Sequence, residues 1–333
     1  MKIVTVDWLP YCLPLRRPWQ NSNGSIGERH GKLLRVQTDD GLTGWGDCAP
    51  LPEFGIDEAA ARDYAEECAR LDLTAQRAGL PLGAWLACSS PMTSVAVNTA
   101  LGAISKVTPE AVQDSLAAGF HILKIKVGNG PLAEEIERLQ MLCAALPAGI
   151  RLRLDANAAW DAADAERFLA ACRSLPIDGV EEPLHAPDIA TLRRLQALVD
   201  FPLAIDESIH LIACDFWQAP PVRRLIIKPA RLGGLLASVE LGLRAQAAGI
   251  ECIVTSSLES ACGLTVCAHL AAAIAPDACH GLATAEWLAT DTGDPPAIIG
   301  GRMLLPQTPG LGFANSIAPQ PVDTLKPWTK AQT

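Results

Sequence analysis

The chain has 333 residues, of which 49% are hydrophobic, and its formal net charge is −10 at pH 7. This apolar content excludes an intrinsically disordered protein, and the length suffices for one large α/β barrel or two ordinary domains. The acidic charge, without a cluster of Lys and Arg, argues against a nucleic-acid partner.

Residues 1–91 have the pattern of a small α+β domain. Three strand-like runs precede an amphipathic helix, with strands expected at 2–9, 32–38 and 42–48 and the helix at 56–72. The Asp39-Asp40-Gly41 turn between the second and third runs is a hairpin signal. The polar, glycine-containing stretch at 18–31 has the composition of a mobile loop.

From residue 92 onward, short apolar runs alternate with amphipathic helices. Strands are expected at 94–100, 121–127, 151–156, 178–183, 202–208, 223–229, 250–257 and 279–283. Helices are expected at 109–118, 132–145, 161–173, 188–199, 233–248 and 261–275, with a short segment at 212–217. About eight strands alternating with helices predict parallel βαβ units and a TIM-type barrel. A doubly wound open sheet is the alternative, although no G-x-G-x-x-G follows the first strand.

The tail after residue 295 is rich in proline and glycine, and we expect it to pack back on the small domain. The expected domains are therefore residues 1–91, 92–295 and 296–333. The most apolar stretch, at 261–276, is too short to span a membrane. We expect no membrane partner.

Ionisable residues recur where the expected barrel strands end. Lys124 and Lys126 share one strand, and their two-residue spacing puts both side chains on one face. Later strands end on Asp155, Glu181 and Glu182, Asp206 and Glu207, and Lys228. A single Asp at such a place is usually a helix cap. Recurrence in five successive units indicates one shared site at the barrel mouth, where active sites of such barrels lie.

Carboxylates that converge at one barrel mouth repel one another unless a cation lies among them. All-oxygen ligands select a hard ion, and Mg²⁺ accepts a few carboxylates together with water and substrate oxygens. The predicted Mg²⁺ ligands are Asp155, Glu181 and Asp206. The second acid of each pair, Glu182 or Glu207, is expected to orient a lysine, and Asn157 to support the ligands from behind.

Two lysines on one strand face, near a third across the barrel, raise the free-energy cost of one another's charge. Proximity and partial burial lower the pKa, which makes one of them usable as a base near neutral pH. A divalent cation between the lysines can hold a carboxylate and stabilise the charge formed when the adjacent carbon loses its proton. The pattern of Lys124, Lys126 and Lys228 therefore indicates removal of a proton α to a carboxylate.

These motifs resemble those of the enolase superfamily, and specifically its muconate-lactonising-enzyme-like branch. The matching motifs are the K-x-K strand, the D-A-N, E-E-P and D-E-S turns and the I-K-P strand, in this order. Within the branch the chain is most similar to the o-succinylbenzoate synthases, through RLRLDANAAW, EEPL, IIKPARLGG and VTSSLESACGL. The resemblance implies a modified (β/α)7β TIM barrel preceded by an α+β capping domain, whose lid loops close over the barrel mouth.

The resemblance also implies the reaction and the roles of the residues. Lys126 would remove the α-proton of 2-succinyl-6-hydroxy-2,4-cyclohexadiene-1-carboxylate and then protonate the departing hydroxyl, which gives 2-succinylbenzoate for menaquinone biosynthesis. Lys124 would tune this base, Lys228 would stabilise the enediolate from the opposite side of the ring, and Mg²⁺ would bind the substrate carboxylate. The implied substrate-binding residues are Arg153, Ser256, Ser257 and Gly281.

Two other functions stay open. An N-succinylamino acid racemase or a dipeptide epimerase of the same superfamily would use the same lysines on opposite faces of its substrate. Dipeptide epimerases usually carry a D-x-D motif after the eighth strand, where this chain reads CHGLATAEWLATD, and this difference favours the dehydratase. A non-catalytic binding barrel would normally lose a base or a metal ligand, whereas all five strand ends carry an ionisable residue here.

The cysteines indicate the compartment. Eleven are spread from Cys12 to Cys279 without a C-x-x-C pair. Their odd number in a chain of this size argues against a disulfide scaffold and indicates buried free thiols in a reducing cytoplasm. The N-terminus lacks the apolar block of a signal peptide. We therefore expect a cytoplasmic enzyme whose partner is a small-molecule carboxylate.

Overall fold

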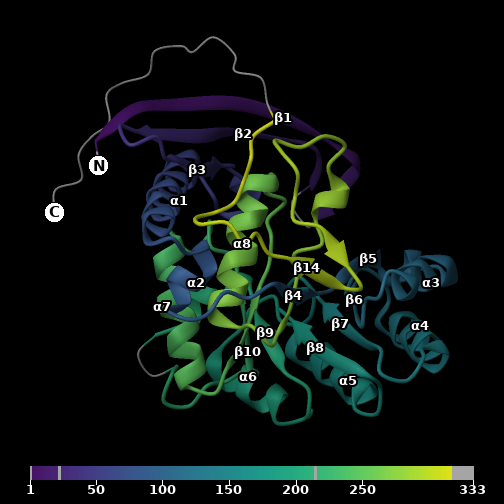
Figure 1. Cartoon of the computed structure of the whole chain (residues 1–333). Coiled ribbons are helices and arrows are strands. Elements are labelled where there is room, and N and C mark those ends of the chain that lie inside the picture. Colours follow the sequence, from purple (N-terminus) through teal and green to yellow (C-terminus); the bar gives the residue numbers. More distant parts are fainter. Residues whose placement is uncertain (1, 22–23, 214–215, 317–333) are drawn as a thin grey trace.

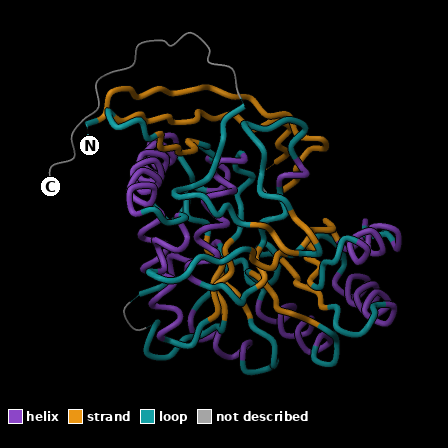
Figure 2. The backbone as a smooth tube through the Cα atoms, viewed as in Figure 1, coloured by secondary structure: helices purple, strands orange, loops and turns teal. Residues whose placement is uncertain are grey.

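The computed structural model describes residues 2–21, 24–213 and 216–316 of the chain (Figure 1). Its strands form a three-stranded antiparallel sheet, a seven-stranded parallel sheet and a four-stranded mixed sheet. Figure 2 shows helices around the outside of the central strands. The architecture is α/β, as predicted, with a β/α barrel that follows a small N-terminal unit.

The N-terminal unit is built on a long antiparallel ribbon. Its elements are β1 (Ile3–Asn21), β2 (Gly24–Thr38), β3 (Thr43–Cys48), the 3₁₀ turn η1 (Pro52–Phe54), α1 (Glu58–Ala78) and α2 (Leu82–Ala87). Asp57 begins α1 by accepting a hydrogen bond from the Ala60 N–H, and Gly79 ends it in the left-handed conformation. The predicted turn at 39–41 joins β2 to β3, with Gly41 at φ +86°.

The prediction of a mobile loop at 18–31 is wrong for the described part of that stretch. β1 and β2 run through it and pair Trp19 with Ile26 and Cys12 with His30, while residues 22–23 lie outside the described residues. The ladder of an antiparallel ribbon uses backbone groups only, so polar side chains on its exposed face do not prevent it from forming. The ribbon lies across the top of the molecule, above the barrel (Figure 1).

Strands and helices alternate through the barrel, as predicted. The strands are β4 (Ser94–Val97), β5 (Thr99–Ala103), β6 (Ile122–Lys126), β7 (Arg151–Asp155), β8 (Ile177–Glu181), β9 (Leu203–Ile205), β10 (Arg224–Ile227), β11 (Glu251–Val254) and β12 (Cys279–His280). The α-helices are α3 (Pro109–Ala117), α4 (Leu132–Ala145), α5 (Ala162–Cys172), α6 (Ile189–Gln196), α7 (Leu235–Ala247) and α8 (Ala261–Ile274). Three 3₁₀ turns are η2 (Ile104–Lys106), η3 (Glu207–Leu211) and η4 (Ala285–Trp287).

Closure of the sheet distinguishes this barrel from an open doubly wound sheet. The parallel strands run in the order β11-β10-β9-β8-β7-β6-β5. β12 closes the gap between the two edges: Gly281 beside it bridges Thr255 after β11 in parallel, and β12 itself pairs with β4, which leads through Asn98 into the edge strand β5. The single strand predicted at 94–100 is therefore two strands, since the chain changes sheets at Asn98, where the barrel closes.

The segment after residue 295 contacts both the barrel and the N-terminal unit. β13 (Ile298–Ile299) pairs with β14 (Arg302–Leu304), which in turn pairs with β4. Further along, the Leu311 N–H donates to Asp72 on α1. The domain limits after residues 91 and 295 stay our proposal, and residues 317–333 lie outside the described part of the chain.

The described residues contain no helix that is long and apolar enough to cross a membrane. The ten cysteines among them are free thiols, as predicted, and most are buried. Cys12 and Cys88 are the exposed ones.

Candidate active site

A cavity of about 580 Å³ lies between the N-terminal ribbon and the carboxyl ends of the barrel strands. The strand-end residues that line it are Lys124 and Lys126 on β6, Asp155 on β7, Glu181 on β8, Asp206 and Glu207 after β9, and Lys228 after β10. Arg17, Trp19 and Phe54 of the N-terminal unit line it from the other side. The five predicted strand ends therefore meet in one cavity.

Lys124 bridges the carboxylates of the two neighbouring strands. Its Nζ lies 2.9 Å from Asp155 Oδ2 and 2.8 Å from Glu181 Oε2. Burial lowers the pKa of Lys124, but the two carboxylates outweigh burial and raise that pKa above its ordinary value. Asn157, which also lines the cavity, donates its backbone N–H to Asp155 Oδ1 at 3.1 Å. Lys124 therefore carries a well-anchored positive charge in this arrangement.

Lys126 lies in a different environment although it shares the strand face of Lys124. Its Nζ lies 5.4 Å from the centroid of the Trp19 ring, and no carboxylate of the described residues forms an ion pair with it. Burial lowers the pKa of Lys126; Asp155 opposes this shift, and the charge of Lys124 adds to it. Of the two lysines, Lys126 therefore loses its proton more readily.

Asp206 is held by two cations on the following βα unit. Its carboxylate accepts hydrogen bonds from Lys228 Nζ and, at 3.1 Å, from Arg231 Nη1. Burial lowers the pKa of Lys228, but Asp206 and its neighbouring carboxylates outweigh burial and raise that pKa. Sequence reasoning missed Arg231, although it follows Lys228 by three residues in the KPAR turn and belongs to the same strand-end pattern.

The donor set fits Mg²⁺ by its chemistry. Asp155, Glu181 and Asp206 are buried and offer only oxygen ligands. Burial, and then the charge of Asp155, raise the pKa of Glu181 to about 8, an effect that a divalent cation among these groups would reverse. No set of one oxygen from each of these three residues lies mutually within 4.8 Å in the described structure, where ammonium groups hold the carboxylates instead. A metal ion would compete with these ammonium groups for the same oxygens.

The second acid of each pair does not orient a lysine in this structure. Glu182 accepts hydrogen bonds from the backbone N–H groups of Asp206 and Ser208 and from the Ser208 hydroxyl, so it supports the turn after β9. Its backbone is left-handed, at φ +42°, which interrupts the alternation of the strand. Glu207 lines the cavity, and its Oε2 is buried without a hydrogen-bond partner among the described residues. Burial, and then Asp206, raise the pKa of Glu207 to about 7.

Arg153 does not line the cavity, which corrects its prediction as a substrate-binding residue. It is buried inside the barrel, where it donates to Asp178 Oδ2 at 2.8 Å, to Asn98 Oδ1 at 3.1 Å and to the Cys279 carbonyl at 2.8 Å. Two residues before Asp155, its side chain leaves β7 on the same side but farther from the carboxyl end. The role that the resemblance implied for Arg153 is therefore wrong, because Arg153 lies one layer deeper in the barrel than Asp155.

Ser256 and Gly281 line the cavity, whereas Ser257 does not. Ser256 Oγ donates to Glu259 Oε2 at 2.5 Å and accepts a hydrogen bond from Thr284 Oγ1 at 2.9 Å. Ser257 is buried beside them, and its hydroxyl has no hydrogen-bond partner among the described residues. Of the two predicted serines, Ser256 is the one that a ligand in the cavity can reach.

Aromatic and cationic side chains from distant segments form the remaining wall. The Arg17 guanidinium carbon lies 4.0 Å from the centroid of the Trp287 ring, and Trp19 meets Trp287 edge to face at 4.6 Å between centroids. Phe54 and Lys106 also line the cavity. The resemblance implied lid loops over the barrel mouth but none of these residues individually, because their segments become neighbours only when the ribbon packs over the barrel.

Comparisons with known proteins agree on the family and divide on the reaction. The family model for enolase C-terminal domain-like proteins matches residues 107–316. An o-succinylbenzoate synthase of Pectobacterium atrosepticum is 30% identical over 300 residues, which cover 84% of this chain and 90% of the relative. An L-Ala-D/L-Glu epimerase of Bacillus subtilis is 27% identical over 313 residues, covering 82% and 85%.

Solved structures match over almost the whole chain. A substrate-liganded complex of the Bacillus subtilis L-Ala-D/L-Glu epimerase matches with a TM-score of 0.85 at 25% identity, covering 96% of this chain and all of that one. A dipeptide epimerase from Enterococcus faecalis, complexed with Mg and a dipeptide, matches with a TM-score of 0.83 at 25% identity, covering 95% of this chain and all of that one. Similarity by itself therefore leaves dehydration and epimerisation open.

Proposed function

Because the chain belongs to the enolase C-terminal domain-like family of enzymes, we propose that it is an o-succinylbenzoate synthase. It would dehydrate 2-succinyl-6-hydroxy-2,4-cyclohexadiene-1-carboxylate to 2-succinylbenzoate, a step of menaquinone biosynthesis. One observation carries the proposal: Lys126 and Lys228 line the same cavity as three buried carboxylates. A lysine base beside a carboxylate cluster that can hold a cation can remove a proton α to a carboxylate and stabilise the resulting negative charge.

Lys126 is the base in this proposal. Its neutral amine takes the proton from the ring carbon that bears the carboxylate, and the electron pair of that bond goes on to form a ring double bond. The hydroxyl on the neighbouring ring carbon leaves and takes the proton back from Lys126, so that water departs and the ring becomes aromatic. The lowered pKa of Lys126 supports this role, because the amine must be free of its proton at the start.

Lys228 and Lys124 contribute fixed positive charge. Their raised pKa values keep both ammonium groups protonated, because each forms ion pairs with cluster carboxylates. We assign Lys228 to the developing negative charge on the substrate and Lys124 to lowering the pKa of its neighbour Lys126. A charged group that needs no rearrangement during the reaction is an efficient stabiliser of such charge.

Asp155, Glu181 and Asp206 would hold Mg²⁺ in this proposal, and the Asn157 backbone N–H would hold Asp155 in position. When bound, the ion would supply positive charge to the substrate carboxylate. The solved structure of the Enterococcus faecalis relative with Mg supports a magnesium-dependent reaction here.

The rest of the cavity supports a substrate with a second carboxylate. Of the described lining residues outside the acidic cluster and its cations, Arg17 and Lys106 are basic and Glu53 is acidic. Ser256 and the backbone at Gly281 offer polar contacts in the same cavity. We assign the succinyl chain to this part of the cavity.

A spectrophotometric assay with the cyclohexadiene substrate tests the function. We expect its absorbance to disappear at an enzymatic rate with Mg²⁺ and to persist when EDTA removes the metal. Failure to convert the substrate with Mg²⁺ present would reject the synthase assignment but would not affect the assignment of the chain to its family.

The second candidate is an N-succinylamino acid racemase or a dipeptide epimerase, and the Bacillus subtilis L-Ala-D/L-Glu epimerase supports the epimerase. This second function is tested by measuring exchange of the α-proton for deuterium in N-succinylamino acids and in dipeptides. The basic residues Arg17 and Lys106 favour the succinylated substrates over dipeptides, which carry an ammonium group. Rapid exchange without any dehydration would establish the isomerase instead.

A further inference from the structure

Three metal-ligating side chains meet on the outer face of the β1–β2 ribbon, away from the cavity. Cys12 on β1 pairs directly with His30 on β2, and Glu28 lies two residues before His30 on the same face of β2. All three are exposed, whereas the alternate residues Leu13 and Arg29 face inward and are buried. The strand period therefore places the trio on one solvent-facing surface of a hydrogen-bonded ladder.

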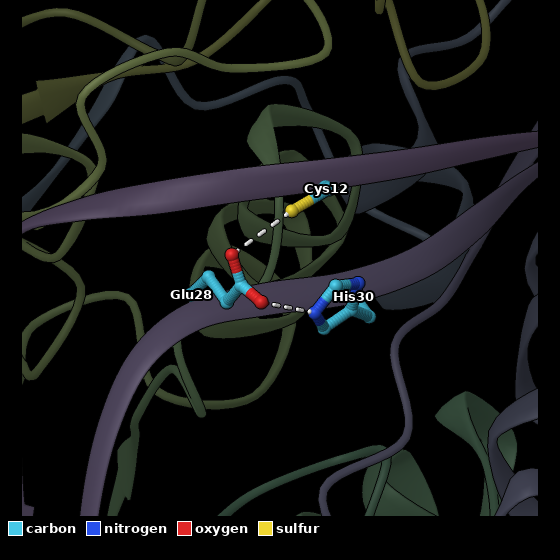
Figure 3. Close-up of side chains that lie close together, drawn as sticks. All are labelled: Cys12, Glu28 and His30. Carbon is cyan, nitrogen blue, oxygen red and sulfur yellow. Dashed lines mark hydrogen bonds and ion pairs between the residues drawn. The ribbon is translucent and has the colours of Figure 1, made fainter.

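Figure 3 shows the glutamate carboxylate between the other two side chains. Cys12 Sγ lies 3.4 Å from Glu28 Oε2, and His30 Nε2 lies 2.8 Å from Glu28 Oε1. One donor atom from each residue lies within 4.8 Å of the other two. No other trio of His, Cys, Asp or Glu in the described residues meets this condition.

We propose that Cys12, Glu28 and His30 form a zinc site. Thiolate, imidazole and carboxylate are the ligand types of zinc, with bond lengths of about 2.0–2.3 Å. The thiolate and the carboxylate together balance the charge of Zn²⁺. Ligands of a tetrahedral ion lie about 3–4 Å apart, so these exposed side chains need to close by only about 1 Å. Three protein ligands leave the fourth position to water.

Binding involves a defined exchange of protons. Cys12 releases its thiol proton to the solvent as sulfur binds the metal. The proton that His30 Nε2 now shares with Glu28 moves through solvent to Nδ1, so that Nε2 becomes free to bind the metal. The hydrogen bonds that now join both residues to Glu28 are replaced by metal–ligand bonds. The zinc affinity should therefore rise with pH while the thiol still carries its proton.

The site is chemically distinct from the acidic cluster in the cavity. That cluster offers only oxygen ligands, which suit a hard ion, whereas this trio adds sulfur and nitrogen. Saturating Mg²⁺ would compete with Zn²⁺ for the cluster during a zinc titration and leave the ribbon site available. The inference is independent of the proposed function, since its measurement is binding and not turnover.

The experiment is a calorimetric titration of the EDTA-treated full chain with Zn²⁺ in excess Mg²⁺. We expect one zinc ion per chain, and a loss of affinity of at least about tenfold in Cys12→Ser and in His30→Gln, because even residues behind the ligands contribute about 10- to 100-fold. Cys88→Ser is the matched control, since Cys88 is exposed and lies outside the trio. Equal zinc affinity in the three variants would overturn the proposal.

A second measurement uses the same pair of exposed thiols. Mass spectrometry after brief alkylation reports the modification of Cys12 and Cys88 separately. Zn²⁺ should slow the alkylation of Cys12 at least about tenfold and leave Cys88 unchanged, because a metal-bound thiolate is not free to react. Equal protection of both cysteines, or of neither, would contradict a site at Cys12.

Discussion

Single residues on one strand face can have opposite chemistry. Lys124 and Lys126 are two positions apart on β6, but only Lys124 lies between carboxylates. The pKa of Lys124 is raised, whereas that of Lys126 is lowered, mainly by burial. The difference arises from partners on neighbouring strands, and it makes Lys126 the better candidate for the base.

Replacing Lys126 with alanine tests this assignment. We expect turnover to fall by about a hundredfold or more, the contribution typical of a general base. Mg²⁺ binding, measured by calorimetry on the same variant, should change little, since Lys126 forms no ion pair with the cluster among the described residues. Turnover within tenfold of the unmodified chain would assign the base elsewhere.

Asp206→Asn tests the proposed ligand set. The change removes one negative charge from the cluster, and we expect Mg²⁺ affinity to fall at least about tenfold, because hard cations prefer charged oxygen ligands. Calorimetric titration at constant pH measures this change, and circular dichroism shows whether the variant is folded. Unchanged affinity in a folded variant would remove Asp206 from the ligands.

At the scale of elements, β3 and α1 approach each other closely at a glycine. A Cβ atom on Gly46 would lie 2.0 Å from the Ala65 carbonyl oxygen in the middle of α1. Backbone atoms of a helix cannot move aside individually, so any side chain here would push the helix off the sheet. The amphipathic pattern of α1 predicted a packed helix, but this contact depends on the observed separation of the two elements.

Gly46→Ala should therefore destabilise the protein by about 1–3 kcal/mol, the range typical of overpacking. Gly27→Ala on β2 is the matched control, since nothing lies within 4 Å of its added Cβ. We expect the control to stay within about 0.5 kcal/mol of the unmodified chain. Urea unfolding of both variants measures the difference, and equal stabilities would contradict the close contact.

At the scale of the whole molecule, a buried histidine joins three distant segments. His269 on α8 accepts a hydrogen bond at Nδ1 from the Gly83 N–H of α2 and donates from Nε2 to the Leu311 carbonyl, both at 3.1 Å. Burial lowers its pKa to about 4. His280 has a similar role within the barrel, with its pKa also lowered by burial to about 4. Both histidines therefore have structural hydrogen bonds.

The lowered pKa of His269 predicts a stability loss on acidification. Between pH 6.5 and 4 the unfolded chain binds a proton at this position and the folded chain does not, so stability present above pH 6.5 is lost as the pH falls. From pH 7 to 5 the loss assigned to His269 is about 2 kcal/mol. Urea unfolding at both pH values should show a smaller loss in His269→Gln, and an equal loss would reject the assignment.

Several features follow from the sequence because their signals are local. The alternation of apolar runs with amphipathic stretches predicted the barrel, and the helix expected at 132–145 coincides with α4. Parallel strands align their carboxyl ends, so Asp155, Glu181 and Lys228 could be placed at one mouth without coordinates. A periodic pattern contains this information because side-chain direction repeats along a strand or a helix.

Other features were decided only by tertiary structure. Whether Lys124 or Lys126 meets a carboxylate depends on the register between strands, and the depth of Arg153 depends on its layer in the closed barrel. The wall formed by Arg17 and Trp287 exists only because the ribbon packs over the barrel. The sequence by itself thus determined the fold and the types of residue at the site. The tertiary structure decided their partners, since contacts between distant segments have no periodic signal along the chain.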